Sequence, residues 1–391
     1  MGSTILVGDA REVLRTLPGD SFDCVVTSPP YWGLRDYGVD GQIGMEPTLA
    51  EHIAVMVDLF REVRRVLKPS GSLFLNYGDC YATTPNGRSA AEVKRVATDD
   101  RAFRDKPFST VGGTLKPKDL CMIPNRLAIA LQDDGWWVRS EIIWGKPNPM
   151  PDSSGLYRPS VAHEKIFLLT KSDDGGFWVA RDTHEISTHP NLDEKCLAIT
   201  TGQPISRWIG LGSFYNAESV RQHSATSTSA TVKKSDGWNT ASGGHGSYHP
   251  DGREKGARVD KQRGHSRRHN GFNDRWDGMS HEEQCANGRY LRNYERAPLP
   301  VWEIATRGFK GNHFATFPPE LVERCLMAGA PRGGCVLDPF GGSGTTALVA
   351  DHLGLDATII ELNPVYAEEI AAVRLKKRAA PSDVLPMFAW R

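Results

Sequence analysis

Short apolar runs alternate with segments of helical spacing over much of this chain, and that alternation limits the folds it can adopt. The runs Leu6-Val7, Cys24-Val25-Val26 and Leu73-Phe74-Leu75 are typical of buried strands. Between the last two, residues 48–67 begin with a capping box and keep apolar residues at helical spacing. Strands joined by helices in this way predict a mostly parallel α/β sheet.

The alternation is interrupted twice along the 391 residues. Residues 81–118 are polar and without periodicity, and we expect a mobile loop with some helix there. Residues 175–297 are rich in Gly, Ser, His, Asn and Arg, and we assign no elements to them. The pattern of strands and helices then returns. We therefore divide the chain into residues 1–174, an inserted region at 175–300, and residues 301–391.

The composition narrows the partners and the compartment. Lysine plus arginine equals aspartate plus glutamate at 47 each, so no global positive field marks a nucleic-acid-binding protein, and any DNA-binding charge must be local. The seven cysteines form no Cys-x-x-Cys pair, which disfavours a disulfide framework or a zinc knuckle and is typical of a reducing cytoplasm. Because no apolar run approaches membrane-spanning length, we expect a cytoplasmic protein without membrane contact.

The first motif that carries chemistry, Thr27 to Tyr31, follows a predicted strand directly. Pro29 and Pro30 restrict the backbone and leave the Pro29 carbonyl projecting, so an amino group can donate one hydrogen bond to that carbonyl and one to the Ser28 hydroxyl. Tyr31 offers a ring on which a flipped-out base can stack. Taken alone, the motif fits a tight surface turn equally well, because proline pairs are common in turns.

A glycine-rich turn at residues 338–346 lies between a predicted strand and a predicted helix, where backbone amides can approach a ligand closely. It differs from a nucleotide-triphosphate loop because Thr345 stands where such a loop needs lysine. Helix-terminal amides and threonine hydroxyls suit a carboxylate, and an acidic residue that ends the next strand suits ribose hydroxyls. The residues assigned to this binding site are Thr27, Asp338, Pro339, Phe340, Gly342, Ser343, Gly344, Thr345, Thr346, Glu361 and Asn363.

Both motifs resemble those of the amino-methyltransferases of DNA, the family that modifies cytosine N4 or adenine N6. There, Ser/Asp/Asn-Pro-Pro-Tyr is catalytic and Asp-Pro-Phe-x-Gly-Ser-Gly-Thr binds the cofactor, and residues 28–31 and 338–345 match these patterns. The catalytic motif comes first, which resembles the β class. The resemblance covers residues 5–172 and 301–372. It implies a Rossmann-like, doubly wound mixed sheet of the S-adenosylmethionine methyltransferase type, circularly permuted, with an inserted target-recognition region.

The resemblance also implies a cofactor and roles for single residues. The cofactor would be S-adenosylmethionine, with Asp9 facing its adenine, Phe340 packed against it and Glu361 on its ribose. The first of the three parts of the chain would be the catalytic half, the second the target-recognition region and the third the cofactor-binding half. The segment that resembles the cover over the methionine end of the pocket includes His313, Phe314 and Pro318.

Contacts to DNA are expected from two places. Residues 144–151, with Trp144, Lys146 and Asn148, and residues 158–164 resemble the family's motif region beside the target base. A core role for Trp144, a solvated turn for Lys146 and a satisfied buried His163 are equally supported. Residues 253–275 hold eight Lys or Arg against three Asp or Glu, interleaved with aromatic side chains, which suits backbone neutralisation and base contact. A flexible, solvated insertion is the alternative, and without a cysteine pattern its histidines predict no metal site. The DNA-binding candidates there are Arg263, Arg267 and Arg268.

The target base and the partners follow from the same resemblance. Serine at position 28 favours cytosine N4, whereas aspartate there would favour adenine N6, which stays the alternative. The chain has no Pro-Cys dipeptide, so a cysteine adduct is disfavoured and direct transfer to the amine is expected. An RNA or protein methyltransferase and an inactive DNA-binding module are the other classes considered. The expected partner is double-stranded DNA, and a homodimer and a cognate restriction endonuclease are left open.

Overall fold

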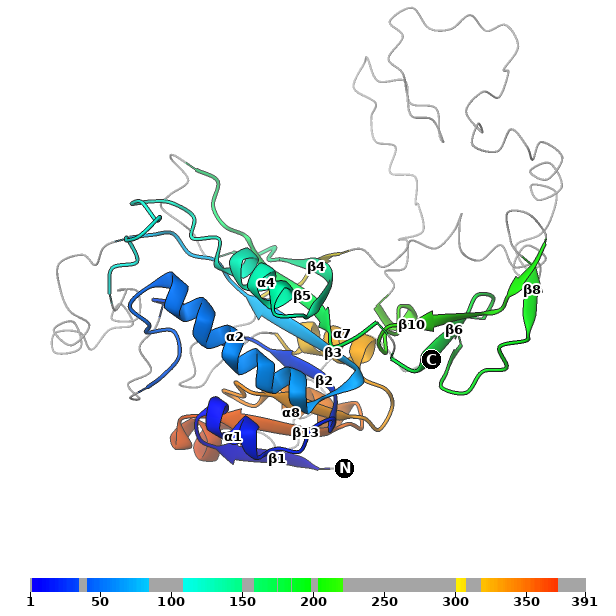
Figure 1. Cartoon of the computed structure of the whole chain (residues 1–391). Helices are drawn as coiled ribbons and strands as arrows, with labels where there is room; N and C mark the ends of the chain where they lie inside the picture. The colour runs from blue at the N-terminus through cyan, green and yellow to red at the C-terminus, as the bar shows by residue number, and fades with distance from the viewer. Residues whose placement is uncertain are drawn as a thin grey trace, which may run out of the picture. The chain divides into compact units, whose positions relative to one another are not determined.

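The structure is a computed structural model that describes residues 2–34, 41–83, 108–149, 158–173, 175–183, 185–197, 203–220, 300–306 and 318–371. The chain divides into two compact units. Met1–Glu194, Ser206–Val220 and Pro298–Arg391 form the first unit, and Lys195–Ile205 and Arg221–Ala297 form the second. The first unit contains the large sheet and the helices that pack on it (Figure 1).

The large sheet has eight strands in the order β1-β13-β12-β2-β3-β5-β4-β11. Strand β5 runs antiparallel to both of its neighbours, and every other neighbouring pair in this sheet is parallel. The sheet is therefore mixed, as the resemblance predicts. Its strands are β1 (Ser3–Val7), β2 (Phe22–Thr27), β3 (Leu67–Tyr77), β4 (Trp137–Gly145), β5 (His163–Thr170), β11 (Val301–Glu303), β12 (Cys335–Asp338) and β13 (Asp356–Glu361).

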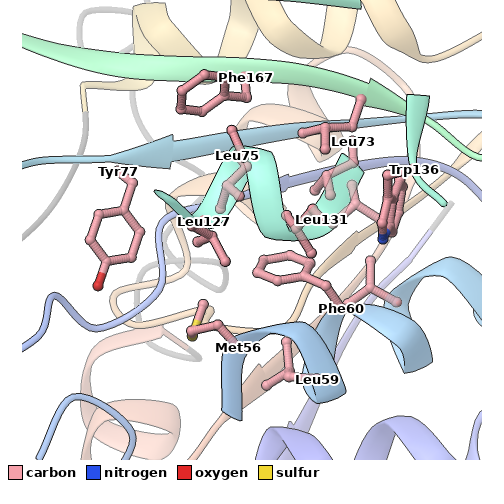
Figure 2. Packing of buried hydrophobic residues seen from close by; sticks show 14 of the residues in the cluster. Met56, Leu59, Phe60, Leu73, Leu75, Tyr77, Leu127, Leu131, Trp136 and Phe167 are labelled. Carbon is pink, nitrogen blue, oxygen red and sulfur yellow. The ribbon is translucent and has the colours of Figure 1, made fainter. Parts of the chain in front are cut away.

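Helices cover both faces of the sheet, because alternate residues of the central strands enter two different cores. Val25 and Leu73 belong to the core that contains side chains of α1, α2 and α4, part of which Figure 2 shows. Val26 and Phe74 belong to the core that contains side chains of α7 and α8. The predicted doubly wound α/β fold is thus confirmed. The helices are α1 (Ala10–Thr16), α2 (Leu49–Val66), α4 (Ile123–Asp133), α7 (Pro319–Gly329) and α8 (Thr345–His352), with a π-helix, η5, at Tyr366–Ala371.

Helix α2 begins where the sequence predicts. The Thr48 hydroxyl accepts a hydrogen bond from the Glu51 backbone N–H at 3.2 Å, and the Glu51 carboxylate accepts one from the Thr48 N–H at 3.0 Å. Such a cap contributes about 1 kcal/mol to helix stability. The helix then buries Met56, Phe60 and Val63 against the sheet (Figure 2). No helix in the described part of the chain combines the length and the apolar character that a membrane span needs.

The chain leaves two neighbouring central strands in opposite directions. Strand β2 leads through α2 to β3 on one side, and β12 leads through α8 to β13 on the other. In open α/β sheets, ligands bind in the crevice outside the carboxyl ends of such a strand pair. Thr27 ends β2 and Asp338 ends β12, so both sequence motifs begin at this crevice.

Short strands occupy a region to which the sequence assigns no elements. Strands β6 (Phe177–Ala180), β7 (Ile186–Ser187) and β10 (Trp208–Leu211) form a three-stranded antiparallel sheet. The strands β8 (Lys195–Leu197) and β9 (Pro204–Ser206) form a pair, and η3 (Glu218–Val220) is a short 3-10 helix. Strands of two to four residues are too short to show periodicity in the sequence, so pairing and aromatic packing reveal them only in three dimensions.

Glu323 on α7 is a buried carboxyl group that takes part in no hydrogen bond or ion pair among the described residues. Glu323 is 3% exposed. Burial and the nearby charge of Glu320, partly offset by Arg324, raise the pKa of Glu323 to about 7. Because the pKa of an unfolded glutamate is near 4.5, folding favours the protonated form. The resulting stability is fully present below pH 4.5 and is lost as the pH rises to about 7.

We expect Glu323→Gln to stabilise the protein at pH 8 and to change little at pH 5. The amide cannot ionise, so the variant avoids a penalty on the order of 3 kcal/mol that the carboxylate carries at the higher pH. Urea unfolding at the two pH values measures the difference. Glu368→Gln is the control, since Glu368 is an exposed glutamate. An equal effect of Glu323→Gln at both pH values would contradict this assignment.

Candidate active site

A buried carboxylate joins the two motifs. Asp338 Oδ1 accepts hydrogen bonds from Thr27 Oγ1 at 2.7 Å and from the Phe340 N–H at 3.0 Å, and its Oδ2 accepts one from Thr346 Oγ1 at 2.6 Å. Asp338 is 1% exposed, and both threonines are fully buried. Burial raises the pKa of Asp338, although its three donors oppose that shift. The three side chains therefore hold the ends of β2 and β12 and the first turn of α8 together from inside the protein.

The glycine-rich turn packs closely against β13 and leads directly into α8. The Gly341 N–H donates to the Ile360 carbonyl at 2.7 Å, and a Cβ on Gly341 would lie 2.8 Å from the Ile359 Cβ. Gly342 and Gly344 have positive φ angles of 50° and 76°, which glycine adopts without strain. The N-terminus of α8 carries no side-chain cap. An anionic group can therefore interact with the positive end of this helix.

Glu361 lies at the carboxyl end of β13, beside this turn. Its Oε2 accepts a hydrogen bond from the Gly342 N–H at 2.8 Å, and its Oε1 accepts one from the Asn363 N–H at 2.8 Å. Burial raises the pKa of Glu361. Since each carboxylate oxygen can accept two hydrogen bonds, both oxygens keep capacity for the hydroxyl groups of a ligand. The Asn363 side chain instead accepts from the Val365 N–H at 2.9 Å.

Asp9 lies just beyond β1, the strand that pairs with β13. It caps α1 by accepting from the Arg11 N–H at 2.8 Å, and it forms an ion pair with the Arg11 guanidinium at 2.5 Å. These hydrogen bonds lower the pKa of Asp9. The register pairs Val7 with Glu361, so Asp9 and Glu361 are at the same edge of the sheet.

The catalytic motif places Ser28 and Tyr31 in one polar cluster. Ser28 Oγ donates to the Tyr31 hydroxyl at 3.3 Å, and that hydroxyl donates to Glu164 Oε2 at 2.8 Å. The hydroxyl also lies 3.3 Å from Asn76 Oδ1. Burial, together with the negative charge of Glu164, raises the pKa of Tyr31 well above its ordinary value. The phenol therefore stays neutral and acts as a donor.

Two residues at the end of β3 hold the Tyr31 ring. The Tyr77 ring stacks on it at a centroid distance of 4.7 Å and an interplanar angle of 28°. Gly78 approaches its edge so closely that an added Cβ would lie 2.6 Å from Tyr31 Cε2. One face and one edge of the ring are therefore occupied by protein. Pro29 is buried and Pro30 is half-buried between Ser28 and this ring.

The turn after β4 is tied to the protein rather than open to a ligand. Lys146 forms a short ion pair with Glu164, and its ammonium lies 4.5 Å from the centre of the Trp144 ring. Trp144 is 3% exposed and donates its Nε1–H to the Ile304 carbonyl at 2.8 Å, so it occupies the core alternative that the sequence left open. The Asn148 amide exchanges two 2.9 Å hydrogen bonds with the Thr306 backbone.

The remaining candidate site residues are either largely enclosed by protein or outside the residues that the structure describes. Ser343 and Thr345 are 2% and 4% exposed, and their hydroxyl oxygens lie 3.3 Å apart. Pro339 is buried, Phe340 is half-buried, and Pro318 caps the start of α7. Five candidates lie outside the described residues, namely His313, Phe314, Arg263, Arg267 and Arg268. Among the residues that are described, no group of three His, Cys, Asp or Glu side chains is placed to hold a metal ion.

Several residues of this site lie outside the two motifs. Glu164 and Asn76 bind the Tyr31 hydroxyl, and Tyr77 stacks on its ring. His52 contacts the Tyr77 hydroxyl from α2. A signal for His52 was present, because it is four residues before Met56 on the apolar face of a helix, where a polar side chain needs a buried partner. The other contacts join distant segments and leave no local pattern.

A family model described as DNA methylase, N6_N4_Mtase, matches residues 22–372. The chain belongs to this family. Membership confirms the predicted activity of a DNA methyltransferase and its predicted cofactor, S-adenosylmethionine.

Individual relatives match over nearly the whole chain. The Type II methyltransferase M.XycI of Xanthomonas campestris pv. cyanopsidis is 36% identical over 375 residues, covering 96% of this chain and 88% of the relative. The Type II methyltransferase M.SmaI of Serratia marcescens is 36% identical over 374 residues, covering 96% and 91%. The solved structure of the cytosine-N4-specific PvuII DNA methyltransferase aligns with a TM-score of 0.49 and 15% identity, covering 98% of this chain and 88% of that one.

We expect Gly78→Ala to slow methyl transfer while leaving cofactor affinity unchanged. The new Cβ would lie 2.6 Å from the Tyr31 ring, which must move, and misplacing a catalytic group by about 1 Å can cost ~100-fold in rate. Incorporation of tritiated methyl groups into DNA measures the rate, and calorimetry measures cofactor binding. Gly112→Ala is the control, because a Cβ there meets nothing within 4 Å. A normal rate in Gly78→Ala would show that the position of Tyr31 is unimportant.

We expect Asp338→Asn to weaken both folding and cofactor binding. The amide cannot accept from Thr27, Phe340 and Thr346 together, and one buried donor left unpaired costs about 1–3 kcal/mol. Urea unfolding and titration with S-adenosylmethionine measure the two effects. Asp351→Asn, an exposed aspartate on the same helix, is the control. If stability falls while cofactor affinity stays at the wild-type value, this carboxylate does not shape the cofactor site.

Proposed function

We propose that the chain transfers a methyl group from S-adenosylmethionine to the N4 amino group of a flipped-out cytosine in double-stranded DNA. The observation that carries this proposal is the 2.7 Å hydrogen bond from Thr27 to Asp338, because it sets the catalytic motif directly beside the glycine-rich turn. A base presented to one loop and a cofactor bound to the other would then meet at the crevice between β2 and β12.

The residues at the crevice fit the cofactor. The uncapped N-terminus of α8 suits its carboxylate, and the remaining acceptor capacity of Glu361 suits its ribose hydroxyls. Val7, which is paired in register with Glu361, is 49% exposed and offers an apolar surface for the adenine next to Asp9. When bound, S-adenosylmethionine supplies the methyl group as an electrophile on a positively charged sulfur.

The catalytic motif is arranged to hold an amino group. Ser28 donates its own proton to Tyr31, so the lone pairs of Ser28 Oγ remain available to accept from the amine. The Pro29 carbonyl is the second acceptor in this proposal. With both amine protons held, the nitrogen lone pair turns out of conjugation with the ring and can attack the methyl carbon directly, without a covalent enzyme intermediate. The new carbon–nitrogen bond replaces the carbon–sulfur bond, a neutral thioether leaves, and one amine proton is lost to solvent.

Buried and enclosed residues receive supporting roles. Asp338, Thr27 and Thr346 position the two loops, and Lys146 holds Glu164 against the Tyr31 hydroxyl. We assign target recognition to residues 175–300, with Arg263, Arg267 and Arg268 on the DNA backbone, on the basis of sequence alone. Residues 1–174 and 301–391 would then be the catalytic and cofactor-binding halves of a circularly permuted enzyme.

The choice of base and the biological setting rest on two supports. Ser28 stands where the family has serine for cytosine N4 and aspartate for adenine N6. The relatives are Type II methyltransferases, so we propose that this chain modifies a specific sequence and protects DNA from a cognate restriction endonuclease.

The wild-type protein should label duplex DNA, and digestion to nucleosides followed by mass spectrometry should show N4-methylcytosine. Ser28→Ala should lose about 100-fold or more in rate, since it removes one oriented partner of the reacting group, while cofactor affinity stays within ~2-fold. Ser70→Ala, at the opposite end of β3, is the control.

The three parts of the proposal, namely the base, the substrate and the role of the motif, fail in different ways. N6-methyladenine as the product would overturn the cytosine assignment and leave the site intact. Labelling of RNA or protein in place of DNA would overturn the substrate, and a fully active Ser28→Ala enzyme would overturn the role of the motif.

A further inference from the structure

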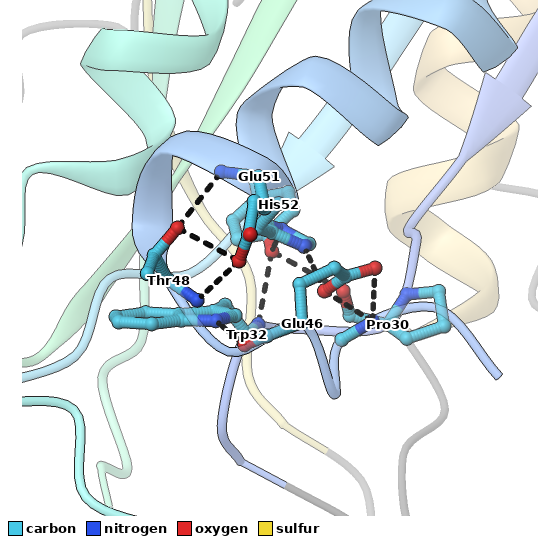
Figure 3. A network of polar contacts seen from close by, with 8 residues as sticks. Pro30, Trp32, Glu46, Thr48, Glu51 and His52 are labelled. Carbon is cyan, nitrogen blue, oxygen red and sulfur yellow. Dashed lines mark hydrogen bonds and ion pairs between the residues drawn. The ribbon is translucent and has the colours of Figure 1, made fainter. Parts of the chain in front are cut away.

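A buried chain of polar contacts runs from α2 to the backbone of the catalytic motif (Figure 3). Glu46 Oε2 lies 2.8 Å from His52 Nδ1, and His52 Nε2 lies 2.7 Å from the Tyr77 hydroxyl. That hydroxyl donates to the Pro30 carbonyl at 3.2 Å and accepts from the Trp32 N–H at 3.1 Å. His52 and Tyr77 are both fully buried.

Counting donors and acceptors assigns the protons in this chain. The Tyr77 hydroxyl has one proton and two lone pairs. If the proton goes to Pro30 and one lone pair takes the Trp32 N–H, then His52 Nε2 must donate to the other lone pair. His52 Nδ1 faces the Glu46 carboxylate, which can only accept. Every partner of the Tyr77 hydroxyl is therefore satisfied when His52 Nε2 carries a proton and Nδ1 faces Glu46.

The surroundings of Glu46 support this assignment. Burial would raise the pKa of Glu46, yet the hydrogen bond and charge of His52 bring it below its ordinary value. The carboxylate also accepts from the Gly44 N–H at 3.0 Å, and the Glu46 carbonyl accepts from the Trp32 indole at 2.9 Å. Trp32 is thus held at its backbone by Tyr77 and at its side chain by Glu46.

The same contacts reach Pro30 and Tyr31, the end of the motif that would hold the base. The Pro30 carbonyl belongs to the peptide that leads into Tyr31, and the Tyr77 ring stacks on the Tyr31 ring at 4.7 Å. Gly44 packs against the backbone of Tyr31, where an added Cβ would lie 3.2 Å from the Tyr31 carbonyl oxygen. Tyr77 therefore sets both the backbone before Tyr31 and the tilt of its ring.

We propose that Glu46 and His52 are positioning residues for methyl transfer, which act through the Tyr77 hydroxyl to fix the Pro30 peptide and the Tyr31 ring. This inference rests on the function proposed above for Ser28 to Tyr31. The pair touches neither cofactor nor base, so it acts on the rate of the chemical step and leaves ligand affinity unchanged.

Tyr77→Phe tests the proposal, because phenylalanine keeps the stacking on Tyr31 and removes the hydroxyl that links His52, Pro30 and Trp32. With saturating tritiated S-adenosylmethionine and unmethylated duplex DNA, we expect the single-turnover rate to fall about 10- to 100-fold. The cofactor Kd and the KM for DNA should stay within ~2-fold. Tyr215→Phe is the matched control, since Tyr215 is a partly buried tyrosine packed in the other core.

His52→Gln and His52→Leu separate positioning from a merely structural role. The glutamine amide can donate to Tyr77 and should retain more of the single-turnover rate, whereas leucine suits a buried site but cannot donate. If the role were only to fill space, leucine would do as well as glutamine or better. Thermal unfolding with bound cofactor confirms that both variants are folded. A wild-type rate in Tyr77→Phe, or a leucine variant at least as fast as the glutamine variant, overturns the proposal.

Ser28→Ala measured in parallel keeps the two proposals apart. An inactive Ser28→Ala together with a fully active Tyr77→Phe would overturn the positioning role alone. A fully active Ser28→Ala would overturn the proposed function, on which the positioning role depends.

Discussion

The arrangement of this protein depends on one buried carboxylate. Asp338 receives donors from Thr27, Phe340 and Thr346, and its bond to Thr27 joins residues 311 positions apart in the chain. An unpaired charge in that place would be costly, so the three donors must be present for the carboxylate to stay buried. The ends of two strands and the start of one helix are therefore fixed together. In the proposed function, a ligand at one loop and a substrate at the other would share this frame.

The Tyr31 side chain is held from two sides. On one side its hydroxyl reaches Glu164, which pairs with Lys146 in the turn after β4. On the other side Tyr77 stacks on the ring and connects it to His52 and Glu46. Loops usually move more than the elements that they connect, yet this loop is constrained by strands and helices at both ends of the side chain. Rigid placement of that kind favours a reaction that depends on orientation rather than on a covalent intermediate.

The sequence predicted the sheet, the start of α2 and the position of each motif at the end of a strand, because each of these follows from local patterns. Thr48 and Glu51 announce the helix start, and Thr27 and Asp338 stand where strands end. The sequence did not reveal that Asp338 points inward, and it left open whether Trp144 lies in the core. Whether a side chain faces a ligand or a neighbouring element depends on contacts between distant segments. The pairing of Glu46 with His52 had no local signal for the same reason, although a histidine on the apolar face of α2 hinted at it.

The order of strands in the large sheet affects how the chain folds during its synthesis. Strand β1 pairs with β13, and β2 pairs with β12, so both N-terminal strands are synthesised long before the strands with which they pair. At typical synthesis rates of about 5–20 residues per second, Thr27 precedes Asp338 by roughly 15–60 seconds. During that interval β1 and β2 lack these partners, and an unpaired strand edge can pair with another chain. The segment Ser28 to Tyr31 is synthesised early, but the carboxylate of Asp338 that ties it to the glycine-rich turn is in place only after β12 is made, so the proposed site is complete only late in synthesis.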